Sequence, residues 1–195
     1  MTHRIATLAL QGDFAEHESA LRQCGVEVME IRQRADLQKT FDALVLPGGE
    51  STVIGKLLRE LELFSPLQER LRDGLPVFAT CAGLILLADR IENDPSACFR
   101  TLDVTVRRNA YGRQLGSFHT EGNFAEMSRV PMSFIRAPSI ERVGTGVTIL
   151  SEYNGKPTAV MQGNQLALAW HPELLSDHRV LTWFLERSAT AGKNR

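Results

Sequence analysis

The chain has 195 residues, 43% of them hydrophobic and 23% charged, which suits one folded domain with a full apolar core. Its 22 basic and 23 acidic residues are interspersed and leave a formal net charge of −1, so charge gives no case for binding nucleic acid or an anionic membrane. No apolar run approaches the roughly 20 residues of a membrane span, and the N-terminus lacks the pattern of a secretory signal. We therefore expect a single domain over residues 1–195, with a polar tail from about residue 189 and no nucleic-acid or membrane partner.

The cysteines give an expectation about the cellular compartment. Cys24, Cys81 and Cys98 are odd in number and widely spaced, and they form neither a CxxC pair nor a metal-ligand grouping with histidines. We therefore expect no metal site, and we expect the protein to be cytoplasmic, in a reducing environment.

The first half of the chain alternates apolar runs with helical patterns. Strands are predicted at residues 4–11, 26–31, 41–46 and 75–80, and helices at residues 14–24, 51–61, 65–72 and from 82 to about 90. Asp13 and Glu16 have the spacing of a capping box at the start of the first helix. Short links between strand, helix and strand indicate right-handed parallel units, whose ligands gather at the carboxyl ends of the strands.

From Thr101 onward the pattern becomes rich in short strands. These strands are predicted at residues 101–107, 117–120, 132–136, 147–150, 158–162 and 165–170. The stretch 109–112 has the composition of a turn, so we expect 117–120 to pair with 101–107. Asn154-Gly155 and Gly163-Asn164 are typical of hairpin turns. An amphipathic helix is predicted over residues 177–188. The whole pattern predicts an α/β fold with a mixed central sheet and an antiparallel-rich second half.

One stretch places a cysteine between a strand and a helix. The apolar run 75–80 leads into Cys81, and the small residues Ala82 and Gly83 open the following helix. A thiol at a helix N-terminus is favoured in its thiolate form, which is the nucleophile. Cys81 is therefore a candidate nucleophile. The alternative is a buried core cysteine, the commonest role for this residue.

A second candidate group follows the strand at 165–170. His171 and Glu173 lie on either side of Pro172, so in extended chain their side chains point the same way. This pattern suits a general base with an orienting carboxylate, and with Cys81 it gives a Cys-His-Glu variant of triad chemistry. The alternative is a His-Pro-Glu loop that only caps the final helix.

The remaining polar groups carry weaker expectations. Gly48-Gly49 offers backbone N–H groups, one of which could form an oxyanion hole with the N–H of Ala82. Arg108, near Arg107 and Arg113, is either part of a solvated hairpin face or a clamp for a substrate carboxylate. The other histidines are expected to be non-catalytic, with His119 the better candidate for a site wall: His3, His17, His119 and His178.

Three motifs stand in order along the chain: Pro47-Gly-Gly-Glu-Ser51, Thr80-Cys-Ala-Gly83 and His171-Pro-Glu173. Together they closely resemble the triad-type (class I) glutamine amidotransferases. Further stretches narrow the resemblance to the glutaminase subunits of pyridoxal 5′-phosphate synthase: Leu10-Gln-Gly12, Arg108-Asn-Ala-Tyr-Gly-Arg-Gln114, Phe134-Ile-Arg-Ala-Pro138 and His171-Pro-Glu-Leu174. The resemblance runs from about residue 5 to about residue 184.

The resemblance implies a three-layer, flavodoxin-like class I glutaminase fold and hydrolysis of L-glutamine to L-glutamate and ammonia. It implies that Cys81 forms a thioester, that Glu173 holds His171 as the proton shuttle, and that Gly49 and Ala82 stabilise the oxyanion. It also implies a set of glutamine-binding residues, with the two arginines facing the carboxylate: Gly49, Glu50, Ser51, Arg108, Ile135 and Arg136. No metal or cofactor is implied.

The same resemblance implies a partner. A barrel-type synthase subunit, in a large hetero-oligomer, would use the ammonia to make pyridoxal 5′-phosphate, and the glutaminase would be active only when docked on it. We also expect the Gly48-Gly49 peptide to flip, so that the oxyanion hole forms on docking. Ala79 stands where the family commonly has glycine, and alanine suits the turn unless that position needs a positive φ.

Three alternatives remain beside this interpretation. The chain could be a triad glutaminase serving another synthase, such as the histidine-pathway one, or a non-catalytic regulatory or docking subunit, or a cysteine hydrolase acting on peptides. The specific stretches count against the first alternative, and the intact Cys81, His171 and Glu173 count against the second. The Gly-Gly-Glu-Ser motif counts against the third.

Overall fold

The computed structural model describes residues 3–96, 98–108, 110 and 117–191, and its centre is a seven-stranded sheet in the order β10-β11-β12-β4-β3-β1-β2. The parallel strands are β12 (Gln165–Leu168), β4 (Val77–Thr80), β3 (Ala43–Leu46), β1 (Arg4–Leu8) and β2 (Glu27–Ile31). An antiparallel hairpin, β10 (Thr148–Tyr153) and β11 (Lys156–Gln162), extends the sheet. The predicted mixed sheet is confirmed, and β4 lies in its middle.

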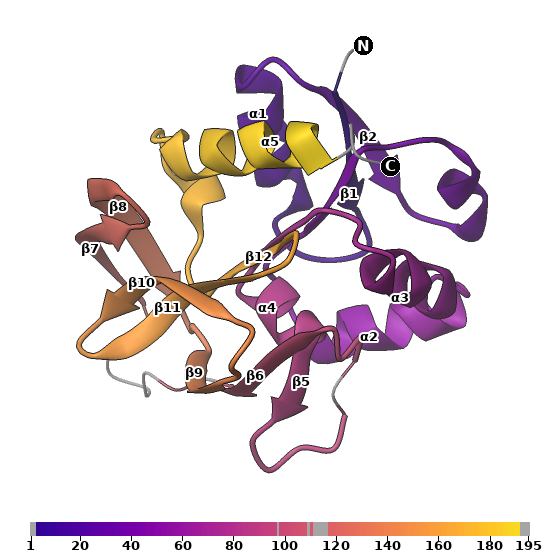
Figure 1. Ribbon diagram of the computed structural model, residues 1–195. Helices are drawn as coiled ribbons and strands as arrows, with labels where there is room; N and C mark the ends of the chain where they lie inside the picture. The colour runs from indigo at the N-terminus through magenta and orange to yellow at the C-terminus, as the bar shows by residue number, and fades with distance from the viewer. Residues whose placement is uncertain (1–2, 97, 109, 111–116, 192–195) are drawn as a thin grey trace.

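Helices cover both faces of this sheet and make three layers (Figure 1). On one face lie α1 (Phe14–Gln23) and α5 (Arg179–Ala191), where Phe78 of β4 packs against Phe184. On the other lie α2 (Ser51–Glu60), α3 (Phe64–Arg72) and the short α4 (Ala82–Leu87). A 3-10 turn, η1 (Arg34–Gln38), links β2 to β3. Because both faces are covered, β3 and β4 are buried at every position, which explains their unbroken apolar sequences.

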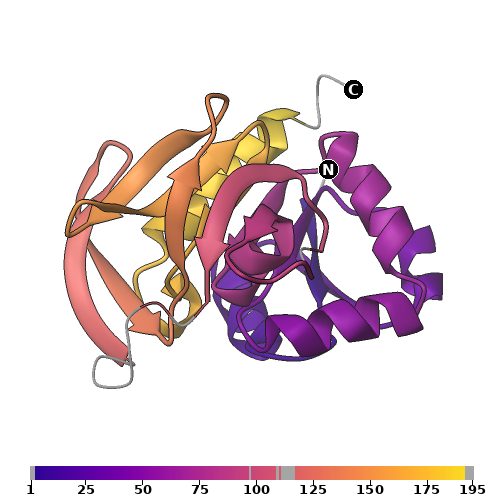
Figure 2. The same cartoon turned by 90° about the horizontal axis from the view of Figure 1, so that it is seen from below.

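Two smaller sheets are built mainly from strands in the second half of the chain. One contains β5 (Ala88–Ile91), β6 (Leu102–Arg107) and β9 (Ser139–Val143), and the other contains β7 (Ser117–Phe124) and β8 (Met127–Ile135). Figure 2 shows β7, β8, β10 and β11 at the end of the molecule away from α2 and α3. The prediction that 101–107 pairs with 117–120 is wrong, since β6 pairs with β5 and β9 while β7 pairs with β8. Most of the turn predicted at 109–112 lies outside the described residues.

The helix after Cys81 is shorter than predicted. It ends at Leu87 instead of about residue 90, because Ala88 turns into extended backbone (φ −53°, ψ 139°) and pairs with Leu102 as the first residue of β5. The apolar run is buried on all sides, and such a run has no periodicity that separates helix from strand. The pairing with β6, which lies outside the local sequence, decides the structure.

Both predicted hairpin turns are confirmed. Asn154 and Gly155 adopt positive φ angles of 51° and 73° between the paired residues Tyr153 and Lys156. Gly163 has a φ of 55° in the two-residue turn that joins β11 to β12. These are the angles that two-residue hairpins demand, and Asn and Gly tolerate them best.

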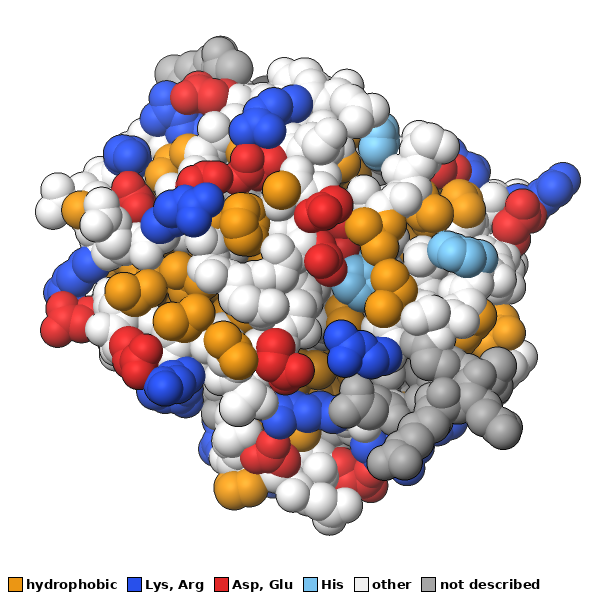
Figure 3. Space-filling model, turned by 180° about the vertical axis from the view of Figure 1, so that it is seen from behind, with side chains coloured by type: hydrophobic (Ala, Val, Ile, Leu, Met, Phe, Trp, Pro, Cys, Tyr) orange, Lys and Arg blue, Asp and Glu red, His pale blue; other side chains and the backbone are white. Residues whose placement is uncertain are grey.

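The outer surface carries mixed charge. On the face drawn in Figure 3, basic and acidic side chains alternate, with hydrophobic side chains between them. Among the helices of the described residues, none is long and apolar enough to cross a membrane.

Candidate active site

Cys81 stands at a sharp turn between the central strand β4 and helix α4. Its backbone (φ 46°, ψ −97°) is strained for a residue other than glycine, and its N–H donates to the carbonyl of Leu168 on β12 at 2.8 Å. Gly83 lets α4 approach β3 closely, since a Cβ there would lie 2.2 Å from the Leu46 carbonyl oxygen. Ala79 is a regular strand residue that pairs with Leu46 and Ala167, so the turn does not need glycine at that position.

His171 and Glu173 form a buried hydrogen-bonded pair. His171 Nδ1 lies 2.7 Å from Glu173 Oε1, and the backbone N–H of His171 donates to Ser133 of β8 at 2.8 Å. The expected extended chain is absent here: Pro172 begins a single 3-10 turn, η2 (Pro172–Leu174), because proline is preorganised for the first position of a helix. The two side chains still meet, as the spacing predicted.

The electrostatics of this pair favour a charged imidazole. Burial alone would lower the pKa of His171, but its hydrogen bonds to Cys81 and Glu173 and their negative charges raise that pKa to about 10. Burial alone would raise the pKa of Glu173, but the neighbouring imidazoles of His17 and His171 lower it. At neutral pH the geometry therefore favours an imidazolium between a carboxylate and the sulfur of Cys81.

We expect the stability that His171 gives the folded protein to vanish as pH rises from 6.5 to about 10. The pKa of His171 is raised from 6.5 to about 10, so the folded state binds its proton more tightly than the unfolded state. The stabilisation by His171 is complete below pH 6.5, the pKa of this residue in the unfolded chain. It is lost as pH rises through the pKa of about 10 that His171 has in the folded protein. The difference in unfolding free energy between wild type and His171→Gln, measured by urea titration, should shrink over this range by a few kcal/mol. A difference that does not change with pH would contradict the assignment.

A cavity of about 330 Å³ opens beside Cys81 and His171. Eight of the ten residues predicted for the site line it: Gly49, Glu50, Ser51, Cys81, Arg108, Ile135, Arg136 and His171. Glu173 lies behind His171, and Ala82 is the buried first residue of α4. The structure thus brings together groups that stand on separate strands in the sequence, all near the carboxyl ends of those strands.

The Gly48-Gly49 loop lies directly against the histidine. A Cβ on Gly48 would come within 2.4 Å of His171 Cε1, and Gly49 has a φ of 144° that side chains disfavour. Hydrogen bonds hold both ends of this peptide segment: the Asp13 N–H donates to the Gly48 carbonyl at 3.1 Å, and the Glu50 N–H donates to Gln11 Oε1 at 2.7 Å. Both glycines are therefore required for the loop to reach the site.

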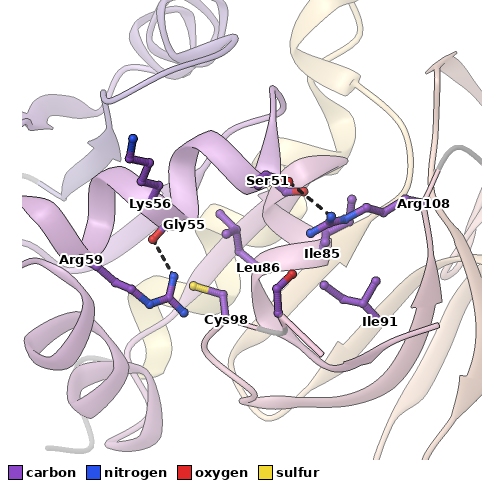
Figure 4. Close-up of a pocket in the computed structure, with 11 residues that line it drawn as sticks. Ser51, Gly55, Lys56, Arg59, Ile85, Leu86, Ile91, Cys98 and Arg108 are labelled. Carbon is purple, nitrogen blue, oxygen red and sulfur yellow. Dashed lines mark hydrogen bonds between the residues drawn. The ribbon is translucent and has the colours of Figure 1, made fainter. Parts of the chain in front are cut away.

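Arg108 forms part of the wall between this cavity and a second one. Its Nη1 donates to Asp94 at 2.8 Å and to Thr52 at 3.3 Å. The neighbouring cavity, of about 300 Å³, is lined by side chains of α2 and α4 together with Cys98 (Figure 4). Burial raises the pKa of Cys98 to about 11, so this thiol stays protonated and unreactive at neutral pH.

Comparison with known proteins shows the family to which the chain belongs. The model of the SNO glutamine amidotransferase family matches residues 7–190. The chain belongs to that family. It is 53% identical over 191 residues to the pyridoxal 5′-phosphate synthase subunit PdxT of Desulfitobacterium hafniense, covering 98% of this chain and 96% of that one. It is 48% identical to PdxT of Streptococcus pneumoniae, covering 93% and 96%.

Solved structures agree on the fold of this amidotransferase. A crystal structure of a glutamine amidotransferase superposes with a TM-score of 0.90 at 41% identity, covering 95% of this chain and 98% of the other. The structure of PurLQS from Thermotoga maritima gives a TM-score of 0.67 at 14% identity, covering 96% and 97%, and so shares the fold. The predicted class I glutaminase fold is confirmed.

Some residues that line the cavity beside Cys81 were not predicted as site residues from the sequence. Gln11 and Asp13 line the cavity, and their position just after β1 is the signal that could have found them. Asp13 makes no side-chain capping bond, so the predicted capping box is absent; instead its Oδ2 lies 3.4 Å from His171 Nδ1. Asp13, His171 and Glu173 bring ligand-type atoms within 4.8 Å of one another, but His171 and Glu173 already bind each other.

The histidines outside the pair are placed differently from one another. His119 lies exposed on β7 and is not among the residues that line the cavity, so the structure does not place it at a site wall. His178 pairs with Gln23 at 3.1 Å, away from the cavity. His17, which we expected to be non-catalytic, is 1% exposed and lies 3.4 Å from Glu173 Oε1.

Proposed function

We propose that the protein hydrolyses L-glutamine to L-glutamate and ammonia, and that it serves as the glutaminase subunit of a pyridoxal 5′-phosphate synthase. The observation that carries the proposal is the meeting of Cys81, the His171–Glu173 pair and the Gly49 loop at one cavity. Membership of a glutamine amidotransferase family supports the reaction, and relatives named as synthase subunits support the assembly.

The reaction would proceed through a thioester. The sulfur of Cys81 attacks the carboxamide carbon of glutamine, and the developing oxyanion accepts hydrogen bonds from the N–H groups of Gly49 and Ala82. His171 then gives its proton to the leaving nitrogen, the C–N bond breaks, and ammonia departs. His171 next takes a proton from water, which attacks the thioester; the C–S bond breaks, glutamate leaves, and the Cys81 thiolate and the His171 imidazolium are restored. Glu173 stabilises the imidazolium throughout. The mechanism needs no metal or cofactor.

The cavity walls suit the two charged groups on the α-carbon of glutamine. Arg108 and Arg136 can pair with the α-carboxylate, because guanidinium binds carboxylate through two parallel hydrogen bonds. Glu50 offers a carboxylate for the α-ammonium, and Ser51 and Ile135 complete the wall. Arg108 already holds Asp94, so the substrate would share or replace that carboxylate.

The partner we propose is a barrel-type synthase subunit that receives the ammonia within a hetero-oligomer. In this proposal the Gly48-Gly49 peptide must rotate to point its N–H into the cavity, and docking on the partner drives that rotation. The glutaminase is then active only in the docked state. Such a rotation would break the hydrogen bond from Asp13 N–H to the Gly48 carbonyl, and glycine at both positions makes it sterically accessible.

We expect glutamate release to depend on the partner. The purified chain is mixed with glutamine, with and without the synthase subunit, and glutamate is measured by a coupled dehydrogenase assay. The complex should release glutamate at least about tenfold faster than the free chain, because docking is needed to form the oxyanion hole, whose single donors contribute about 10²–10³ in rate. Absence of glutamate release by the complex would overturn the proposed function.

A further inference from the structure

A chain of buried polar groups continues behind the His171–Glu173 pair. Thr80, the last residue of β4, places its Oγ1 3.5 Å from Glu173 Oε1, and His17 of α1 places its Nε2 2.9 Å from that hydroxyl oxygen. His17 and Thr80 are 1% and 0% exposed. Three elements from different parts of the chain therefore converge on one carboxylate oxygen.

Only one assignment of donors and acceptors fits the hydrogen bonds among these buried groups. Glu173 is a carboxylate and can only accept, so Thr80 donates its hydroxyl hydrogen to Glu173 Oε1. The Thr80 oxygen then accepts from an N–H on His17 Nε2. Burial lowers the pKa of His17, so its imidazole is neutral and carries its proton on Nε2 in this arrangement. His17 therefore donates to Thr80, and Thr80 donates to Glu173. Glu173 also accepts a hydrogen bond from His171.

These contacts control how the carboxylate of Glu173 is oriented. Its other oxygen, Oε2, is buried and has no hydrogen-bond partner among the described residues. The contacts from His171, Thr80 and His17 therefore all fall on Oε1. Without the Thr80 hydroxyl, the Glu173 carboxylate would keep its hydrogen bond from His171 but would lose the one from β4.

The ring of His17 is itself held in place. It packs edge-on against Phe78, with ring centroids 6.0 Å apart and an interplanar angle of 80°. The charged and titratable groups that face it are Asp13 and Glu16 from α1, with His171 and Glu173 from the end of β12 and η2. A buried neutral imidazole that only filled space would leave its N–H without a partner, which is costly. Here the Nε2–H of His17 is hydrogen-bonded to Thr80.

We propose that His17 and Thr80 are positioning residues of the glutaminase site: they orient the Glu173 carboxylate, which in turn sets the orientation and basicity of His171. This inference rests on the proposed function for its kinetic meaning, but its geometry concerns only the Cys81–His171–Glu173 group. Mutation of a residue that hydrogen-bonds to a catalytic or metal-binding side chain typically lowers activity or metal affinity by about 10–100-fold.

Thr80→Val tests the proposal with little change in side-chain shape, and Thr80→Ser restores the hydroxyl. In the complex, Thr80→Val should lower kcat about 10-fold or more while KM for glutamine changes less than about 3-fold, and Thr80→Ser should recover most of the loss. His17→Phe should act in the same direction, because it keeps an aromatic ring but removes the N–H. The matched control is Thr158→Val, which removes a buried threonine hydroxyl on β11 that donates to Ser151 of β10, outside the site.

A second readout uses the free subunit and no glutamine. The rate of alkylation of Cys81 by iodoacetamide is followed against pH, with Cys24→Ala and Cys98→Ala as the background. Weaker support of Glu173 makes His171 less basic, so the thiolate that it stabilises should form at higher pH in Thr80→Val than in Thr80→Ser or Thr158→Val.

The proposal is overturned if folded Thr80→Val and His17→Phe keep the wild-type kcat and the wild-type alkylation profile, or if they lose only thermal stability. A wild-type complex without glutamate release would refute the proposed function, whereas the alkylation profile would still decide the positioning role.

Discussion

Replacement of Cys81 by alanine should lower glutamine hydrolysis by the complex at least about 10⁴-fold, because the variant has no atom that can form the thioester. The fold should be kept, since Cys81 is a small side chain at a turn fixed by its backbone N–H bond to Leu168. The binding of glutamine that we propose for Arg108 and Arg136 cannot replace the nucleophile, so kcat should fall even if KM for glutamine stays the same. Glutamate release and thermal unfolding are measured on the same preparation.

The other two cysteines supply the controls for this experiment. Cys98 is buried with a pKa raised to about 11, and burial also raises the pKa of Cys24. Cys24→Ala and Cys98→Ala should therefore retain glutaminase activity within about 3-fold, since neither thiol contacts the cavity beside Cys81. Full activity of Cys81→Ala would refute the mechanism, and loss of activity in either control would mean that thiol removal harms the fold.

Replacement of Gly83 by alanine should destabilise the protein by at least about 2 kcal/mol and lower its melting temperature by about 4–8 °C. The added Cβ would lie 2.2 Å from the Leu46 carbonyl oxygen and 3.0 Å from Leu46 Cβ, so α4 must move away from β3. That movement displaces Cys81 and the N–H of Ala82, and glutaminase activity should fall about tenfold or more. Calorimetry and the glutamate assay measure the two effects.

Gly55 of α2 provides the matched control for Gly83. It is also a helical glycine, but a Cβ there would meet its nearest neighbour, Arg59 Nη1, at an ordinary 3.5 Å. Gly55→Ala should therefore be neutral or stabilising by up to about 1 kcal/mol, because alanine favours the helix. Equal stability of Gly83→Ala and Gly55→Ala would show that α4 is not packed against β3 as tightly as the structure indicates.

The parts of the site that the sequence predicted correctly are those set by local chemistry. The run into Cys81 is strand, turn and helix because apolar and small residues follow each other there, and Pro172 brings Glu173 next to His171 within three residues. The meeting of the Gly49 loop with Cys81 was also predictable, since both follow parallel strands whose carboxyl ends share one edge of the sheet.

The parts that were wrong or missed depend on contacts between distant segments. Strand β5 begins at Ala88 only because β6 is available to pair with it, and nothing in the local run indicates this. The contacts of His17 were missed because its partners, Thr80 and Glu173, lie 63 and 156 positions further along the chain. Single-sequence patterns describe neighbours along the chain, so a buried polar contact between separate elements leaves no trace in them.

The claim on which the whole account depends is that Cys81 attacks the side-chain carbonyl of a glutamine-like substrate in the cavity beside His171. A glutamine analogue that carries a diazoketone in place of the carboxamide would trap this attack as a stable thioether, and mass spectrometry of the complex and its peptides locates the adduct. We predict one adduct per chain, on Cys81, which forms more slowly when L-glutamine is present. An adduct on Cys24 or Cys98, or labelling of Cys81 that L-glutamine does not slow, would contradict it.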